Sequence, residues 1–178
     1  MTAPIESVVV LSRALDQAAD VLDAIHPDQL GLPTPCSQWT VEQLAAHVVQ
    51  DPRNLLAMAR GEEVDWSATP PPIQVGHAED FREAADDLIH HWHQLGDEAD
   101  PTTVDWQTAE LAVHTWDLCR ATGQQRELDE EVAERGLAFM QGTMKPEMRG
   151  DAFAPEVPAP DGAGPYERLA AFAGRTPR

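Results

Sequence analysis

Apolar residues recur at intervals of three and four along most of the chain, which is the pattern of amphipathic helices. The first apolar stripe predicts a helix over residues 5–25. A second helix is predicted over residues 41–58, because Thr40 and Gln43 have the spacing of a capping box at its start. Pro52 lies inside this second helix and predicts a kink rather than an end.

A proline-rich segment, residues 61–75, follows the second helix and predicts a long connection. Helical spacing resumes after it. It predicts a third helix with its apolar stripe from Phe81 to Leu95, a fourth from about Thr102 to Thr122, a fifth capped by Asp129, and a short terminal helix from Pro165 to Ala173. Gly123 and Gly174, directly after the fourth and the terminal helix, are typical of helix ends.

No segment alternates convincingly with the period of two that is typical of half-buried β-strands, so we predict an all-α fold. Four substantial helices with one long connection between the second and the third favour a four-helix bundle with a crossover. The fifth helix is then an addition to the bundle. We assign residues 1–142 to the bundle, and residues 143–178 to an extended tail and short terminal helix packed on the same domain.

The chain carries 31 acidic and 12 basic residues, a formal net charge of −19, which argues against binding to nucleic acid or to an anionic membrane. Its longest uninterrupted apolar runs have five residues, far short of a membrane span. The chain starts without a cationic signal segment, and its two cysteines are too few for a disulfide framework. We therefore expect a cytoplasmic monomer or homodimer with small-molecule partners.

Two residues of the fourth predicted helix, Glu110 and His114, lie four positions apart and so share one face. Zinc accepts both imidazole nitrogen and carboxylate oxygen, although such a pair alone is common by chance on exposed helices. His47, on the inward face of the second helix, is a third candidate ligand, but a buried histidine can also simply hydrogen-bond a carbonyl. Two histidines and one carboxylate leave a fourth position open, as in catalytic zinc sites.

Two aspartates lie close to these candidate ligands in the sequence. Asp117 follows His114 by three residues, and Asp51 follows His47 by four. Each has two interpretations, as a further metal ligand or as an acceptor that holds an imidazole in one tautomer. For Asp117 we predict a catalytic role, in which it orients the histidine or accepts a proton.

The histidine-rich segment 90–93 is the densest group of this residue type. Trp92 belongs to the buried stripe of the third predicted helix, so we expect His91 and His93 to face solvent. No carboxylate is placed to complete a metal site with them. The segment is therefore not a candidate site.

Two motifs carry a resemblance to a known family. The first comprises Pro33-Thr34-Pro35-Cys36, Trp39-Thr40-Val41 and Leu44-Ala45-Ala46-His47-Val48; the second comprises Glu110, His114, Trp116-Asp117-Leu118 and Ala121-Thr122-Gly123. Together they resemble the DinB/YfiT-like metal-binding proteins and, more closely, the N-terminal domain of mycothiol-dependent maleylpyruvate isomerase. The closing stretch, from Phe153 to Arg175, is similar to the tail of a related single-domain subfamily.

This resemblance implies a four-helix bundle that holds one divalent metal, usually zinc, through His47, Glu110 and His114. It also implies that a low-molecular-weight thiol such as mycothiol binds as thiolate at the open metal position. The residues after 142 are too few for the second domain of the isomerase. We therefore do not expect the isomerase reaction itself to carry over.

The leading hypothesis is a metal-dependent enzyme of S-transferase type that joins a small thiol to a small electrophile. The alternative is a non-catalytic protein that binds a divalent metal in stress or sequesters a ligand. Hydrolysis by metal-bound water ranks last, because only Asp117 and Asp51 offer themselves as a general base. The sequence does not distinguish zinc from nickel or other divalent ions.

Overall fold

The computed structural model describes residues 5–36, 39–150 and 153–176, and this part of the chain forms α-helices and short 3-10 turns without a β-strand. An antiparallel bridge pairs Pro33 with Thr40. The helices are α1 (Glu6–Asp23), α2 (Val41–Ala59), α3 (His77–Leu95), α4 (Pro101–Thr122), α5 (Glu130–Thr143) and α6 (Pro165–Phe172). The all-α prediction is confirmed.

Local signals start and stop the helices where the sequence predicts. At the start of α2 the Thr40 hydroxyl accepts a hydrogen bond from the Gln43 backbone, and the Gln43 side chain accepts one from the Thr40 backbone. The helix then continues through Pro52, whose missing N–H does not end it. Gly123 ends α4 with a φ of 67°, which glycine adopts at little cost.

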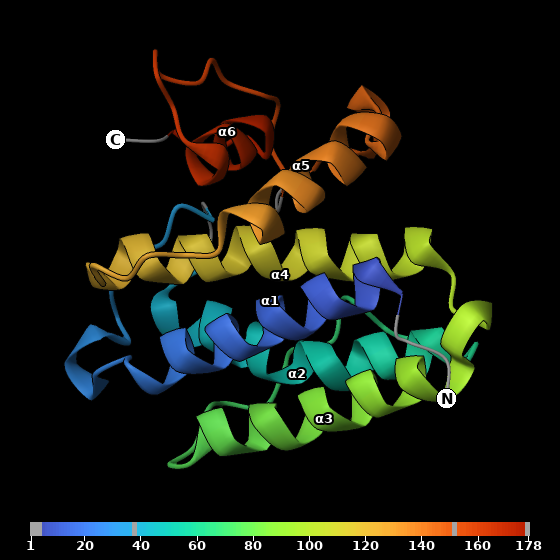
Figure 1. Cartoon of the computed structure of the whole chain (residues 1–178). Helices are drawn as coiled ribbons and strands as arrows, with labels where there is room; N and C mark the ends of the chain where they lie inside the picture. The colour runs from blue at the N-terminus through green and yellow to red at the C-terminus, as the bar shows by residue number, and fades with distance from the viewer. Residues whose placement is uncertain (1–4, 37–38, 151–152, 177–178) are drawn as a thin grey trace.

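The first four helices form a bundle in which α1 and α2 each pack against both α3 and α4 (Figure 1). In this arrangement α1 lies diagonally opposite α2, and α3 lies diagonally opposite α4. The α5 helix crosses the outer side of α4, and α6 packs against α5 and α4, away from α2 and α3. The boundary that we set at residue 142 stays a prediction.

The α4 helix is the centre of the molecule, because it contacts α1, α2, α5 and α6. It consequently buries polar residues as well as apolar ones, and each buried polar group needs a partner. The Gln107 side chain has two: it accepts a hydrogen bond from Trp92 Nε1 at 3.0 Å and donates one to the Leu55 carbonyl at 3.4 Å. Three further polar residues of α4 form the centre described below.

The connection from α2 to α3, residues 60–76, contains no regular helix and passes beside the first half of α2. It rests on α4 through Trp66, whose ring meets the Trp106 ring edge to face with centroids 5.9 Å apart. The predicted long connection is thus present. None of the helices in the described residues is both long and apolar enough to cross a membrane.

Candidate metal centre

The three predicted ligands meet between α2 and α4. His47 Nε2 lies 3.1 Å from Glu110 Oε1, and His114 Nε2 lies 3.1 Å from the same oxygen. The candidate ligand atoms all lie within 4.8 Å of one another. The tertiary structure therefore brings the three side chains together, with both imidazoles directed by Nε2 at one carboxylate. Their role as ligands stays a prediction.

The charges of this cluster favour an ionised carboxylate. Burial opposes ionisation of Glu110, but the charge and hydrogen bonds of His114 and His47 outweigh it and hold the pKa of Glu110 well below its usual range. Burial likewise opposes protonation of His114, but Glu110 and Asp117 outweigh it and raise the pKa of that imidazole. A divalent cation can replace the protons that bridge such a cluster, since it binds neutral imidazoles and a carboxylate.

Asp51 adds a second carboxylate beside the cluster. The side chain is 0% exposed, and neither oxygen accepts a hydrogen bond from a described residue, although Oδ1 lies 3.3 Å from His47 Nε2. Burial raises the pKa of Asp51 to about 7; His47 opposes this increase and Glu110 adds to it. A buried carboxylate without hydrogen bonds is costly, and a nearby cation would offset that cost. The donor set therefore fits a divalent metal such as zinc.

Asp117 lies on the other side of His114. Its Oδ2 is 3.4 Å from His114 Nδ1, whereas the Nε2 of the same ring faces Glu110. Arg175 also binds this carboxylate, through Nε at 3.1 Å and Nη2 at 2.8 Å. The two aspartates thus differ in a way that sequence spacing does not show. Asp51 faces His47 Nε2, the nitrogen that also points at Glu110. Asp117 faces His114 Nδ1, the nitrogen that points away from Glu110.

Cys36 is buried close to His114 and Asp117, and these three residues form a second group with ligand atoms within 4.8 Å. Burial raises the pKa of the Cys36 thiol, although the charges of His114 and Arg175 lower it in part. The guanidinium of Arg175 already neutralises Asp117. A cation at this second group would be repelled by it, so the first group is the stronger candidate.

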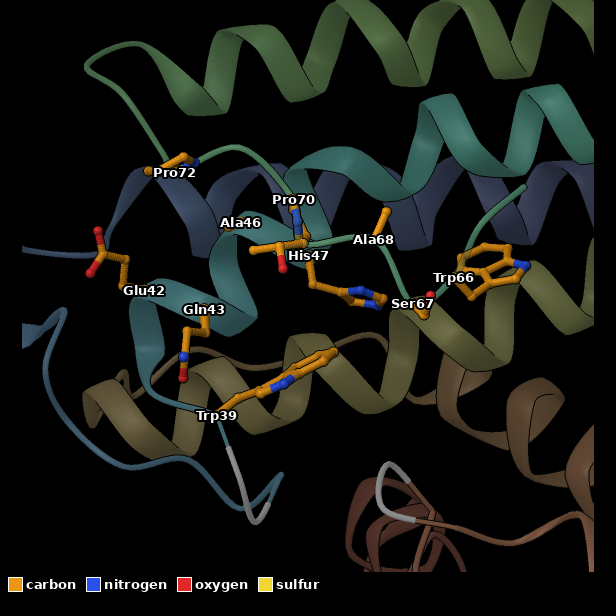
Figure 2. Close-up of a pocket in the computed structure, with 11 residues that line it drawn as sticks. Trp39, Glu42, Gln43, Ala46, His47, Trp66, Ser67, Ala68, Pro70 and Pro72 are labelled. Carbon is orange, nitrogen blue, oxygen red and sulfur yellow. The ribbon is translucent and has the colours of Figure 1, made fainter. Parts of the chain in front are cut away.

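A cavity of about 420 Å³ opens beside His47 (Figure 2). The start of α2 forms one wall and the connection to α3 forms the other. The Trp39 ring lies against the His47 imidazole, with ring centroids 4.8 Å apart. The residues that line the cavity all lie within the described part of the chain, and none of them is Lys or Arg. They are Trp39, Glu42, Gln43, Ala46, His47, Trp66, Ser67, Ala68, Thr69, Pro70 and Pro72.

No role at the site was predicted from the sequence for Arg175 or Trp66, and Trp39 was named only as part of the first family motif. The signal for Arg175 is faint: it is one of two arginines that follow Gly174 at the end of the terminal helix. Trp66 stands in a proline-rich connection where an exposed position is the ordinary expectation. In the histidine-rich segment, His93 is exposed as expected, whereas His91 is half-buried with its Nε2 covered.

Comparison with known proteins finds the same family that the sequence motifs resemble. The family described as the mycothiol maleylpyruvate isomerase N-terminal domain matches residues 11–122, a range that contains the whole His47–Glu110–His114 cluster. Two proteins described as uncharacterized, from the Oshkosh (CDC 1551) and H37Rv strains of Mycobacterium tuberculosis, are each 35% identical over 183 residues, covering 93% of this chain and 96% of the relative. No solved structure gives a significant match. The chain belongs to the family of the mycothiol maleylpyruvate isomerase N-terminal domain.

Proposed function

We propose that this protein is a metal-dependent enzyme that uses a low-molecular-weight thiol such as mycothiol and transfers it to an electrophile. One observation carries the proposal: His47, one of the three residues of the His47–Glu110–His114 cluster, lines a cavity large enough for a small ligand. The family name adds the link to mycothiol. Membership alone does not fix the reaction, so the proposal rests on the chemistry of the cluster.

The three side chains offer two imidazole nitrogens and one carboxylate oxygen as ligand atoms. A divalent cation held by them would lower the pKa of a thiol and keep it ionised near neutral pH. Asp117 orients the His114 ring, because its carboxylate faces the nitrogen that points away from the cluster. Asp51 adds negative charge on the His47 side, which strengthens cation binding.

The cavity receives the electrophile beside His47. Trp39 and Trp66 offer flat apolar surfaces, while the prolines of the connection make its wall stiff. Chlorodinitrobenzene serves as a model electrophile. When the thiol is transferred to it, the thiol sulfur forms a bond to the ring carbon that carries chlorine. Chloride leaves with the electron pair of the C–Cl bond, and the thiol proton passes to the buffer.

The test combines metal analysis with an absorbance assay. Purified protein is expected to contain a divalent metal in a one-to-one ratio and to conjugate mycothiol to chlorodinitrobenzene. His47→Ala and His114→Ala should lose both metal and activity. His93→Ala is the matched control, because His93 is an exposed histidine on α3, outside the cluster. Retained activity in both cluster variants would refute the site.

Asp51 is the observation that favours the second candidate function, a protein that binds metal without catalysis. If its carboxylate occupies the position left open by the three ligands, no place remains for a thiol. A calorimetric titration with mycothiol separates the two functions. Thiol binding that disappears on metal removal supports the enzyme, and a metal-loaded protein without thiol affinity supports the non-catalytic alternative.

A further inference from the structure

We propose that the C-terminal tail is part of the metal centre, and that Arg175 is a positioning residue that acts on His114 through Asp117. The inference rests on the metal centre of the proposed function. Arg175 lies outside residues 11–122, the range matched by the family. The tail would thus supply, from the far end of this chain, a group that holds a candidate ligand in place.

The guanidinium of Arg175 is deeply buried: the residue is 3% exposed. It donates two hydrogen bonds to the Asp117 carboxylate, from Nε to Oδ1 at 3.1 Å and from Nη2 to Oδ2 at 2.8 Å. Its Nη1 donates to the Ala173 carbonyl at 2.8 Å. A two-point contact between planar groups fixes the carboxylate plane as well as its position. Asp117 therefore has little freedom to rotate.

The same carboxylate reaches the histidine. Asp117 Oδ2, which accepts from Arg175 Nη2, also lies 3.4 Å from His114 Nδ1. The Nε2 of that ring points at Glu110. A carboxylate that accepts a hydrogen bond from Nδ1 keeps the imidazole proton on Nδ1. The lone pair of Nε2 is then free to bind a metal, which is the arrangement of carboxylate–histidine–metal sites. Arg175 thus acts on the far nitrogen of His114 through one intervening residue.

The tail is built to deliver this arginine. Gly174 has a φ of 83°, and a Cβ on it would lie 2.5 Å from the Ala154 carbonyl oxygen, so glycine is required directly before Arg175. Phe153 lies near both His114 and Arg175: its ring centroid is 6.2 Å from that of His114, and Arg175 Cζ lies 5.5 Å from it, over the ring. The tail therefore packs against the ring that it positions.

A purely structural salt bridge is the competing explanation, and the chain offers a control for it. Arg149 also anchors the tail, through Nη1 to the carbonyls of Ala154 and Phe172 at 2.6 and 2.7 Å. These bonds hold the tail to itself and do not reach Asp117. If Arg175 only docked the tail, loss of either arginine would have similar consequences for the centre.

The experiment compares zinc affinity, by competition with a chromophoric chelator, across variants whose thermal unfolding is measured in parallel. Arg175→Gln should weaken zinc binding by about 10–100-fold, the range found when an outer partner of a metal-binding histidine is lost. Arg175→Lys keeps the charge but not the two-point contact, so it should fall between. Arg149→Gln should lower stability and leave zinc affinity unchanged.

Asp117→Asn and the double variant Asp117→Asn/Arg175→Gln keep the test informative where Arg175→Gln fails to fold. If Arg175 acts through Asp117, the double variant loses no more zinc affinity than Asp117→Asn alone. The long-range nitrogen–proton NMR spectrum of the zinc-loaded protein should show the His114 proton on Nδ1 in the wild type and in Arg149→Gln, but exchange-broadened in Arg175→Gln.

Two results overturn the inference in distinguishable ways. Wild-type protein that binds none of zinc, cobalt or nickel overturns the proposed metal centre and this inference with it. Wild-type protein that binds zinc, with equal affinity in Arg175→Gln or with additive losses in the double variant, overturns the inference alone and leaves the proposed function standing.

Discussion

Replacing Asp51 by asparagine should have opposite effects on the metal-free and the metal-loaded protein. The substitution keeps the shape of the side chain and removes a charge that is fully buried without a hydrogen bond from a described residue. In the metal-free protein that charge is a cost, so Asp51→Asn should raise stability. In the loaded protein it attracts the cation, so the same change should weaken binding.

The magnitude follows from the pKa of Asp51. Burial raises that pKa from 3.8 to about 7, so the folded chain holds a proton that the unfolded chain has released. Wild-type stability therefore falls as pH rises from about 4 to 7, by up to ~4 kcal/mol at 1.36 kcal/mol per pKa unit. The buried amide of the variant itself costs about 1–3 kcal/mol where it lacks partners. A net gain of roughly 2 kcal/mol results at pH 8.

The assay is thermal unfolding of chelator-treated wild type and Asp51→Asn between pH 5 and 8. A gain of this size raises the Tm of a chain of this length by about 4–8 °C, and the difference between the two proteins should shrink toward pH 5. Zinc titration of the same samples should show weaker binding by the variant. A metal-free variant that melts below wild type at pH 8 would refute the buried-charge argument, and unchanged zinc affinity would remove Asp51 from the centre.

Three further outcomes are expected. Gly174→Ala should destabilise the protein by more than about 2 kcal/mol in urea unfolding, because the added Cβ meets the Ala154 carbonyl oxygen; Gly123→Ala also has a positive φ but open space around it, and should cost only about 1 kcal/mol. Trp66→Ala should weaken mycothiol or electrophile binding with zinc affinity unchanged, since Trp66 lines the cavity and rests on Trp106. Wild-type protein stripped of metal should have a lower Tm than the metal-loaded protein. When the free metal concentration is a thousand times Kd, bound metal stabilises the fold by ~4 kcal/mol, and removing it loses that stabilisation.

Much of the secondary structure was predictable because its signals are local. The Thr40–Gln43 box spans three residues and sets the start of α2, and Gly123 ends α4 through its own φ. Glu110 and His114 share a face through helical periodicity alone. Each of these features depends on chain neighbours, so a single sequence contains the necessary information.

The candidate site was predictable only in part. The motif around His47 pointed to the same centre through family resemblance, but its approach to Glu110, 63 residues away, is a tertiary contact. The sequence also left Asp51 and Asp117 with identical alternatives. Packing separates them, because Asp51 faces His47 Nε2 and Asp117 faces His114 Nδ1. Side-chain direction of this kind depends on neighbours that only the fold supplies.

The sequence by itself determined the helices, the acidic balance and the residue types able to bind a cation. Tertiary structure alone decided that Arg175, 58 residues from Asp117 in the sequence, binds the carboxylate that faces His114. The physical reason is that the hydrogen bonds of a helical turn join residues a few positions apart in the sequence. A buried charge needs a partner of opposite charge, and that partner can come from any part of the chain that the fold brings next to it. In this protein the chain returns at its end, and the tail faces the candidate metal centre.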